Sequence, residues 1–508
     1  STAEPHQDLS SIILSSSQQV SKFLPKQILT RIGDDNLVLK SLIDRKNRDW
    51  NAIVSKLYAT EEKLNGISLN TLKKSLLPKL KRLSFENTMK LDQMLMANVG
   101  SDITKFSIPM YECIFLNLSD LKPLKNEPAY NEKIIETMKM LLARFDEAIE
   151  LQKNQAVADK GNLNLAKLEM NQFILNTCIK FASKLLDFRT MEFFLSKFNK
   201  DYNVKPNREN YTTVIQFYTK IGVSKQAWDI FDTMKFLSLE HKPDEITYNT
   251  VLHLCNKEKN YAKAINLYNE MIDLGINPSI KTLNIMSKTM ATASSDSVVS
   301  EGKSESLRLL GWKYIHEIEN NPQLRHQKHE SNNYYHTLTS MLALSAYDGD
   351  VGLARALYHK YITSKFKENV VKWKVNFADS NRIDYKKVWR NTLDPQLFNY
   401  LLLAYSNYSN EKLPILFGYE QGAILRRNIL NSADYVGRTE SGDVINAKLP
   451  MLPVIDMNQP WQIFSESRAL WQFNLEFGGA IDLRDHSKST ELEELSKIAN
   501  ESQDFDVF

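Results

Sequence analysis

Length and composition already restrict the fold class. The chain has 508 residues, 43% apolar and 25% charged, which is enough apolar material for a sizeable core. Only 16 glycines and 15 prolines are present, too little turn chemistry for an all-β fold, so we predict a predominantly helical protein. Lys and Arg exceed Asp and Glu by only 64 to 61, so the net charge does not indicate a nucleic-acid partner, and any basic surface must be local.

The cysteines and the apolar runs exclude further classes. Cys113, Cys178 and Cys255 lie far apart without a metal-binding spacing, and their apolar neighbours predict buried thiols. No apolar run approaches the roughly 20 residues of a transmembrane helix, so we predict no membrane span. The chain begins at Ser1 without a hydrophobic secretory segment or an Arg-rich presequence, and we expect that a targeting peptide has either been removed or never existed.

The first third of the chain carries weak helical patterns. We expect residues 1–49 to form an N-terminal extension and residues 50–169 to form degenerate helical repeats. Within the second range, apolar residues at helical spacing predict helices over 109–114 and 134–149, separated by a loop over 121–131.

An internal repeat occupies residues 170–290, the best-matched part of the chain. Four landmark residues recur 37 positions later, in the pairs Tyr211 and Tyr248, Ala227 and Ala264, Phe231 and Tyr268, and Met234 and Met271. Pro243 and Pro278 are 35 positions apart, so the two extra residues fall in the loop around 236–241.

Each copy contains two apolar stripes with helical spacing. The first copy has Tyr211, Val214, Ile215 and Tyr218 on one helix and Ala227, Ile230, Phe231 and Met234 on the next. A short turn separates the stripes and a proline ends each copy, which predicts a helix-turn-helix hairpin. One hairpin cannot bury both stripes by itself, so we predict an all-α solenoid of stacked hairpins, right-handed or left-handed because the pattern does not fix the hand.

Weaker copies flank this region. One covers 175–207, and another begins at Thr282 and is interrupted by residues 291–306, whose Ser-rich composition predicts a flexible insertion. The remaining segments are expected to be degenerate helical repeats over 307–412, a C-terminal helical region over 413–481 and an acidic tail over 482–508.

Two copies resemble a known family. Residues 242–279 look like the 35-residue pentatricopeptide repeat, through Thr247-Tyr248-Asn249-Thr250, the stripe from Ala264 to Met271, and the endings Lys242-Pro243-Asp244 and Gly275-Ile276-Asn277-Pro278-Ser279. The tetratricopeptide repeat has the same hairpin plan, but its Trp-x-x-Leu-Gly-x-x-Tyr start is absent.

The resemblance implies single-stranded RNA binding, with one base per repeat read by two or three side chains. In the family these are a polar residue early in the first helix and the last residue of the repeat. The candidate pairs are Asn176 with Asn207, Thr212 with Asp244, and Asn249 with Ser279, followed by Asn284 without an assigned partner. Residues of these types are also common N-caps, and capping is the alternative role for each of them.

Phosphate contacts are expected from basic residues near the same groove. Residues 365–390 carry a local excess of Lys and Arg, interleaved with Trp373 and Trp389; a solvated helix face with two packed tryptophans is the alternative. The basic residues are Lys365, Lys367, Lys372, Lys374, Arg382, Lys386, Lys387 and Arg390.

The sequence shows no pattern for catalysis, a metal or a cofactor. The family's deaminase-like and metallonuclease extensions need motifs that do not occur after residue 413. His326 and His329 have no further ligands nearby, so we assign them to a surface loop. We predict neither an enzyme nor a protein with a small-molecule substrate.

Two functional classes remain, an RNA-binding adaptor and a helical scaffold that binds protein through the same groove. The resemblance favours RNA and implies an organelle, because this family acts on mitochondrial or plastid transcripts. The composition, rich in Asn, Lys and Ile, and the degenerate repeats resemble those of the fungal mitochondrial members of the family. The expected function is maturation or stabilisation of RNA in the mitochondrial matrix. The expected partners are a ribosomal or messenger RNA and the small ribosomal subunit, and activation of mRNA translation is an alternative.

Overall fold

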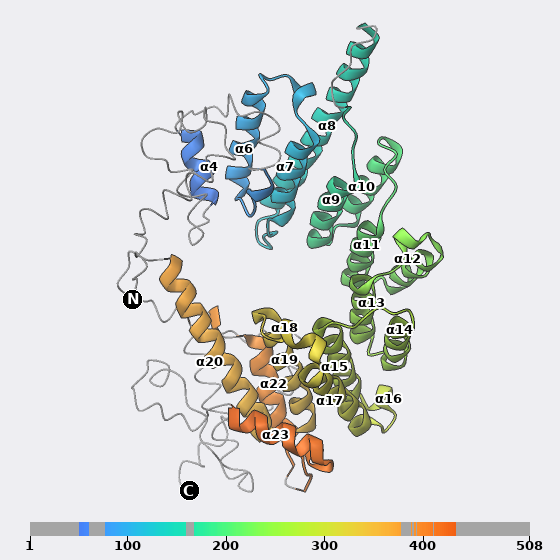
Figure 1. The fold of residues 1–508 in the computed structure, drawn as a ribbon, viewed down its shortest axis with the longest axis vertical. Helices are drawn as coiled ribbons and strands as arrows, with labels where there is room; N and C mark the ends of the chain where they lie inside the picture. The colour runs from blue at the N-terminus through green and yellow to red at the C-terminus, as the bar shows by residue number, and fades with distance from the viewer. Residues whose placement is uncertain are drawn as a thin grey trace, which may run out of the picture. The chain divides into compact units, whose positions relative to one another are not determined.

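The computed structural model describes residues 50–59, 77–158, 167–376, 388, 391–392, 394–409 and 411–432. These residues form helices and connections, with no strand among them (Figure 1). They divide into two compact units, residues 1–243 and 244–508, which are described separately. In the described part of the chain, no helix is both long and apolar enough to cross a bilayer. The predicted extension over 1–49 and the acidic tail lie outside the described residues.

The described part of the first unit consists of helices and 3₁₀ turns with their connections. Its helices are α4 (Trp50–Ala59), α6 (Phe85–Asn98), α7 (Ile108–Asp120), α8 (Pro128–Ala158), α9 (Gln172–Leu185), α10 (Phe188–Lys200), α11 (Arg208–Ile221) and α12 (Ser224–Phe236). Single 3₁₀ turns are η2 (Leu77–Lys79), η3 (Ile103–Lys105) and η4 (Leu239–His241). The helices predicted over 109–114 and 134–149 are confirmed as parts of α7 and α8.

The described part of the second unit also consists of helices and 3₁₀ turns. Its helices are α13 (Glu245–Glu258), α14 (Tyr261–Asp273), α15 (Ile280–Ser294), α16 (Ser297–Ser300), α17 (Ser304–Asn320), α18 (Arg325–Lys328), α19 (Ser331–Asp348), α20 (Val351–Asn376), α22 (Pro395–Ser406) and α23 (Glu420–Ser432). Two 3₁₀ turns accompany them, η5 (Pro322–Leu324) and η6 (Ile415–Gly418).

Consecutive helices pair into hairpins, and the hairpins stack through their first helices. In the first unit α9 packs on α10 and α11 on α12, while α7, α9 and α11 lie side by side (Figure 1). In the second unit α13 packs on α14, α15 on α17 and α19 on α20, and the row of first helices runs α13, α15, α19, α22. The predicted all-α solenoid of helix-turn-helix repeats is therefore confirmed.

The apolar stripes supply the continuous core. In the second copy every stripe residue is buried, from Tyr248 to Met271, and in the first copy Ile215, Phe231 and Met234 are fully buried. Each large side chain buried in this way contributes about 1.5–3 kcal/mol. The three cysteines are buried free thiols, as predicted, and burial raises the pKa of the Cys113 and Cys255 thiols to about 12.

Glycine is required at the turn inside the hairpin of α19 and α20. Gly349 adopts the left-handed conformation with φ +73°, and a Cβ built on it would lie 2.2 Å from the carbonyl oxygen of Asn407. Asn407 ends α22 and donates from Nδ2 to the Ala346 carbonyl at 3.0 Å. The end of α22 is thus fixed against the turn of the preceding hairpin.

The flexible insertion predicted over 291–306 is corrected by the structure. Helix α15 continues to Ser294, and the short helix α16, capped by Asp296, leads to α17. Ala291, Ala293 and Ser300 are completely buried. Composition misled here because small residues bury little apolar side chain but allow helices to approach closely. The approach is close, because a Cβ on Gly311 of α17 would lie 2.7 Å from the Leu344 side chain and 3.3 Å from the Ser287 carbonyl oxygen.

The two extra residues of the first copy fall where the sequence places them. The connection between α12 and α13 covers 237–244 and contains η4, whereas the corresponding connection between α14 and α15 covers only 274–279. The insertion therefore lengthens a surface loop and leaves the spacing of the helices unchanged.

Replacing Ala264 by Asp should destabilise the protein strongly. The side chain is 0% exposed in α14, so an unpaired carboxylate would enter the core and lower the free energy of unfolding by about 3 kcal/mol or more. Ala262→Asp is the matched control, because Ala262 is exposed on the same helix and a change there should stay within about 0.5 kcal/mol. Urea denaturation followed by circular dichroism measures both. Equal midpoints would show that residue 264 does not lie between packed helices.

Candidate nucleic-acid interface

The last residue of each predicted repeat caps the first helix of the next. Asn207, Asp244 and Ser279 are the N-caps of α11, α13 and α15. Each accepts a hydrogen bond from the backbone N–H three residues later, and the side chain of that later residue accepts from the N-cap N–H in return. The capping role considered from sequence is therefore confirmed for all three residues.

The Asp244 cap uses only part of the carboxylate. Its Oδ1 accepts from the Thr247 N–H at 3.0 Å and from the Thr247 hydroxyl at 2.9 Å. Asp244 is half-buried, and its Oδ2 accepts no hydrogen bond from the described residues. Capping therefore leaves one acceptor oxygen at this position for a ligand.

Asn176 is held from two sides within the first unit. It lies on α9 with 8% of its surface exposed, and its Nδ2 donates to Oε1 of Glu209 at 2.7 Å. Its Oδ1 lies 2.8 Å from the hydroxyl of Thr213, whose single proton is shared with the Glu209 carbonyl at 3.0 Å. Because a carboxylate can only accept, the amide nitrogen must face Glu209, and the orientation of this side chain follows from its partners.

Asn249 repeats this arrangement in the second unit. It lies on α13 and is 4% exposed. Its Nδ2 donates to Oε1 of Glu245 at 3.2 Å, and its Oδ1 accepts from the hydroxyl of Thr282 at 2.7 Å. Thr282 is also the residue that completes the Ser279 cap of α15, so one hydroxyl joins the cap to the candidate base-contacting side chain.

In Asn284 the amide nitrogen, and not the oxygen, bonds to the threonine hydroxyl. Its Nδ2 donates to the hydroxyl oxygen of Thr337 at 3.1 Å, and the hydroxyl donates in turn to the Asn333 carbonyl. Since the single hydroxyl proton is used there, Thr337 must accept from the amide, and the Oδ1 of Asn284 points elsewhere. That oxygen is buried and has no hydrogen-bond partner among the described residues. A buried acceptor without a partner is costly to the fold.

Thr212 occupies the corresponding place on α11. It is 4% exposed, and its hydroxyl donates to the Arg208 carbonyl at 2.9 Å, one turn earlier in the same helix. Its candidate partner Asp244 belongs to the second unit. Base contact by any of the seven candidate residues stays a prediction.

A row of basic residues follows the candidate base-contacting positions. Lys180 lies four residues after Asn176, and Lys184 and Lys220 lie eight residues after Asn176 and Thr212. At about 100° per residue, four and eight positions place a side chain within about 40° and 80° of the starting face, one and two turns further along. The row therefore lies on the same side of the first helices.

The lysines of the first unit influence one another. Burial lowers the pKa of Lys184; Asp120 opposes this shift and Lys180 and Lys220 add to it. Lys184 donates to the carbonyls of Ser119 and Leu121, and Lys220 to the Ser183 hydroxyl at 3.4 Å. These ammonium groups are thus held at the C-terminal ends of neighbouring first helices, where the helix dipole favours them.

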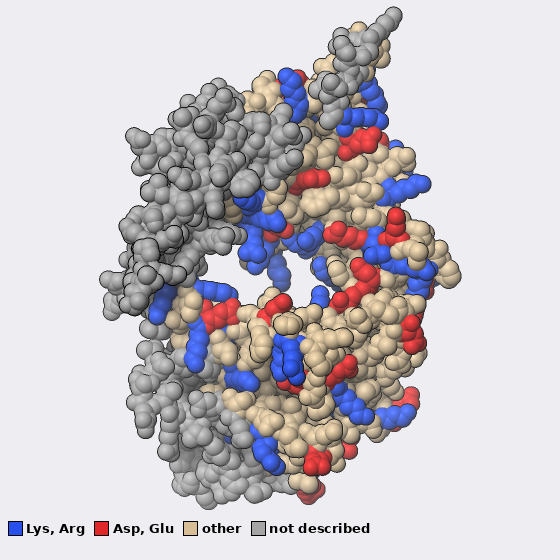
Figure 2. All heavy atoms as spheres, viewed as in Figure 1, with Lys and Arg blue, Asp and Glu red and all other residues tan. Residues whose placement is uncertain are grey.

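The second unit has an equivalent cluster. His253 and Lys257 follow Asn249 by four and eight residues, and Lys288 follows Asn284 by four. Burial lowers the pKa of Lys288, and burial together with Lys288, Lys281 and Lys257 lowers the pKa of His253. Acidic and basic side chains are otherwise interspersed over the visible surface (Figure 2). Recurrence of Lys at a fixed distance after the polar position was visible in the sequence, and the sequence analysis missed it.

The basic stretch predicted over 365–390 is described only in part. Lys365, Lys367, Lys372 and Lys374 lie on α20, and the four remaining basic residues and Trp389 lie outside the described residues. Glu368 pairs with Lys365 and Lys372 and accepts from the Tyr335 hydroxyl at 2.6 Å. Two of these lysines therefore already have an acidic partner, and phosphate binding by the stretch stays a prediction.

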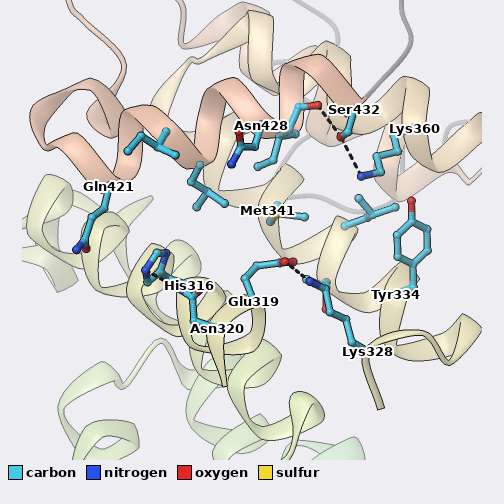
Figure 3. Close-up of a pocket in the computed structure, with 15 residues that line it drawn as sticks. His316, Glu319, Asn320, Lys328, Tyr334, Met341, Lys360, Gln421, Asn428 and Ser432 are labelled. Carbon is cyan, nitrogen blue, oxygen red and sulfur yellow. Dashed lines mark hydrogen bonds and ion pairs between the residues drawn. The ribbon is translucent and has the colours of Figure 1, made fainter. Parts of the chain in front are cut away.

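A cavity of about 470 Å³ lies between α17, α19, α20 and α23 (Figure 3). An ion pair between Lys328 and Glu319 closes one side, and Lys360 donates to the Ser432 hydroxyl at 3.0 Å on another. Apolar residues line much of the wall, namely Leu338, Met341, Ile424, Leu425 and Ile429. No nucleophile is paired with a base in the lining, and the cavity is an apolar pocket with polar residues at its rim.

Metal-binding clusters are absent from the part of the chain that the structure describes. His326 lies in the short helix α18 and His329 directly after it, both exposed, so the surface position is confirmed but a helix replaces the expected loop.

Comparison with protein families identifies the repeats. A model described as the PPR repeat family matches residues 243–292, and one described as the PPR repeat matches residues 209–238. The first range contains the α13–α14 hairpin and most of α15, and the second contains α12 and all but the first residue of α11.

Similar whole proteins come from yeasts. The chain is 55% identical over 505 residues to the mitochondrial 15S rRNA processing factor CCM1 of Lachancea thermotolerans, which covers 98% of this chain and 57% of that protein. The protein of the same name in Zygosaccharomyces rouxii is 55% identical over 501 residues, with 98% and 57% covered. That of Saccharomyces cerevisiae strain S288c is 40% identical over 515 residues, with 99% and 59% covered. The chain spans less than two thirds of these curated relatives.

Solved structures of a pentatricopeptide repeat protein also align. The crystal structure of PPR10 from maize has a TM-score of 0.35 at 13% identity, covering 76% of this chain and 48% of that one. PPR10 in complex with an 18-nt psaJ RNA element has a TM-score of 0.31 at 15% identity, covering 97% and 68%.

Removing the Asp244 cap should cost stability, and replacing it by another good cap should not. Asp244→Ala deletes the side-chain bond to the Thr247 N–H and should lower the free energy of unfolding by about 1 kcal/mol. Asp244→Asn keeps an acceptor at the cap and should change it by less than about 0.5 kcal/mol. Chemical denaturation of the two variants distinguishes these values. Equal losses would mean that the charge of Asp244, and not its hydrogen bond, stabilises α13.

Proposed function

The chain is a pentatricopeptide repeat protein, and from this premise we propose that it binds single-stranded RNA along its row of first helices. The bound strand is a mitochondrial RNA, and the biological role is maturation of the small-subunit ribosomal RNA. Support for the role comes from three relatives at 40–55% identity that carry the name of mitochondrial 15S rRNA processing factor. We propose the same compartment, the mitochondrial matrix, and the small ribosomal subunit as a further partner.

The observation that carries RNA binding is the repetition of one polar arrangement in register. Asn176 and Asn249 each present an amide whose orientation is set by a glutamate and a threonine. Asn284 sits in the same register and has an unpaired carbonyl oxygen. Lysines follow on the same side of the helices within each unit. A strand whose bases meet the amides would have its phosphates near these lysines.

The proposed role is passive. The protein would act by shielding or presenting a strand, so purified protein with magnesium should leave a bound oligonucleotide intact. Cleavage that disappears on mutation of one of its own acidic residues would instead establish a nuclease site.

The salt dependence of RNA binding should identify the lysine row. In filter binding, the logarithm of the association constant should fall linearly with the logarithm of salt concentration. Lys220→Gln should weaken all RNAs equally and reduce the slope by about 0.7, the value for one phosphate contact on a single strand. Lys225→Gln is the control, because Lys225 is exposed on α12, the second helix of the same hairpin. Absence of salt-sensitive RNA binding would favour the protein-binding scaffold.

Asp244→Asn should change the base preference at a single position. The family resemblance implies that Asn at the early position goes with pyrimidines and Thr with purines. A terminal Asp can only accept and so suits the imino N–H of G, and the expected core is pyrimidine-G-pyrimidine. The amide of Asn offers a donor as well, so the preference should move from G towards A by about 1–3 kcal/mol. Competition between four oligonucleotides that differ at this base measures the shift. An equal loss for all four would show that Asp244 serves the helix cap alone.

A further inference from the structure

Two glutamates occupy the amide donors that the proposed RNA site would use. Glu209 Oε1 lies 2.7 Å from Nδ2 of Asn176, and Glu245 Oε1 lies 3.2 Å from Nδ2 of Asn249. Both stand in the first turn of a first helix, α11 and α13. We propose that Glu209 is an affinity-determining residue of the RNA groove, because it competes with the base for the Asn176 amide. This inference rests on the proposed function and deepens it.

The competition follows from the hydrogen-bonding capacity of Asn176. The amide has two N–H donors and one oxygen with two lone pairs. Glu209 takes one donor and the Thr213 hydroxyl takes one lone pair, and the side chain is 8% exposed, so little of its remaining capacity faces outward. A base that approaches must use what remains or displace Glu209.

The carboxylate is the stronger acceptor of the two. A hydrogen bond to an ionised carboxylate is shorter and stronger than one to a neutral carbonyl such as that of a pyrimidine. Glu209 is itself exposed, so its negative charge also faces an incoming phosphate chain. Both effects act against RNA at this repeat. Glu245 makes a longer bond to Asn249, so its effect should be weaker in the same direction.

The amide of Asn284 is held without a carboxylate. Asn284 differs in this respect, because its donor goes to the neutral hydroxyl of Thr337. The repeats are therefore unequal, with Asn176 held most firmly. A substitution that removes only the charge of Glu209 should weaken its hydrogen bond to Asn176 without removing a side chain from the fold.

The decisive comparison uses Glu209→Gln and a matched control in the full chain. Glu192→Gln removes the same charge from an exposed residue on α10, the second helix of the hairpin that carries Asn176. Binding is measured with a labelled single-stranded RNA that has a pyrimidine-G-pyrimidine core. Glu209→Gln should tighten binding by about 3- to 10-fold, and Glu192→Gln by less than about 2-fold.

Two further measurements distinguish competition at Asn176 from a general effect of removing a negative charge. At high salt the gain of Glu192→Gln should vanish while most of that of Glu209→Gln persists, because a contact is screened less than a distant charge. An RNA that is abasic at the first pyrimidine, the position assigned to Asn176, should gain no more from Glu209→Gln than from Glu192→Gln. Thermal unfolding of both variants confirms that they remain folded.

The outcomes distinguish the inference from the proposed function. Equal affinities for Glu209→Gln and Glu192→Gln, with RNA bound by all proteins, would overturn the competition and leave RNA binding intact. Weaker binding by Glu209→Gln would also overturn it, since Glu209 would then contact the base as a ligand. Failure of the unmodified protein to bind any RNA would overturn the proposed function and this inference with it.

Discussion

The N-terminal capping of the first helices is the constraint on which the rest of the site depends. A helix leaves its first N–H groups without intrahelical partners, and here a repeat-terminal residue supplies one acceptor each time, as Asp244 does for Thr247. The cap fixes where the helix starts and therefore which residue stands five positions later. Asn249 follows Asp244 by five positions and Asn284 follows Ser279 by five, so the caps set the register of the candidate base-contacting row.

The same constraint links successive hairpins. Thr282 accepts from the Ser279 N–H and donates to Asn249 of the preceding first helix. Asn210 plays a related part in the first unit, because it completes the Asn207 cap and donates to the carbonyl of Gln172 in α9 at 3.1 Å. Buried polar groups between first helices are costly unless paired, and the pairing holds neighbouring helices in one relative position. Capping and base contact are therefore compatible roles for the same positions.

The fold was predicted correctly from the spacing of apolar residues. The flexible insertion was predicted wrongly from composition, because small residues allow backbones to pack closely. The stripes around Ala264 predicted the hairpins because apolar spacing reports directly on burial. Residues 291–306 lack such spacing, yet Ala293 and Ser300 are buried because α15 and α17 approach through small residues. The repeat pattern indicates which polar residues share a register, but it does not indicate their hydrogen-bond partners. Nothing in the sequence alone shows that the Glu209 side chain on α11 reaches Asn176 on the neighbouring helix α9.

The local distribution of charge matters more than the net charge for the proposed binding of RNA by this nearly neutral chain. The net charge of +3 is spread over 508 residues, but lysines gather on the side of the first helices where the asparagines lie. Glutamates stand beside Asn176 and Asn249, so under the proposed function these two repeats would combine attraction of the phosphate chain with opposition at the base. Such a balance weakens binding to arbitrary strands while leaving the donors and acceptors in place. Selectivity would then come from what a correct base gains over the carboxylate it replaces, and not from the total positive charge.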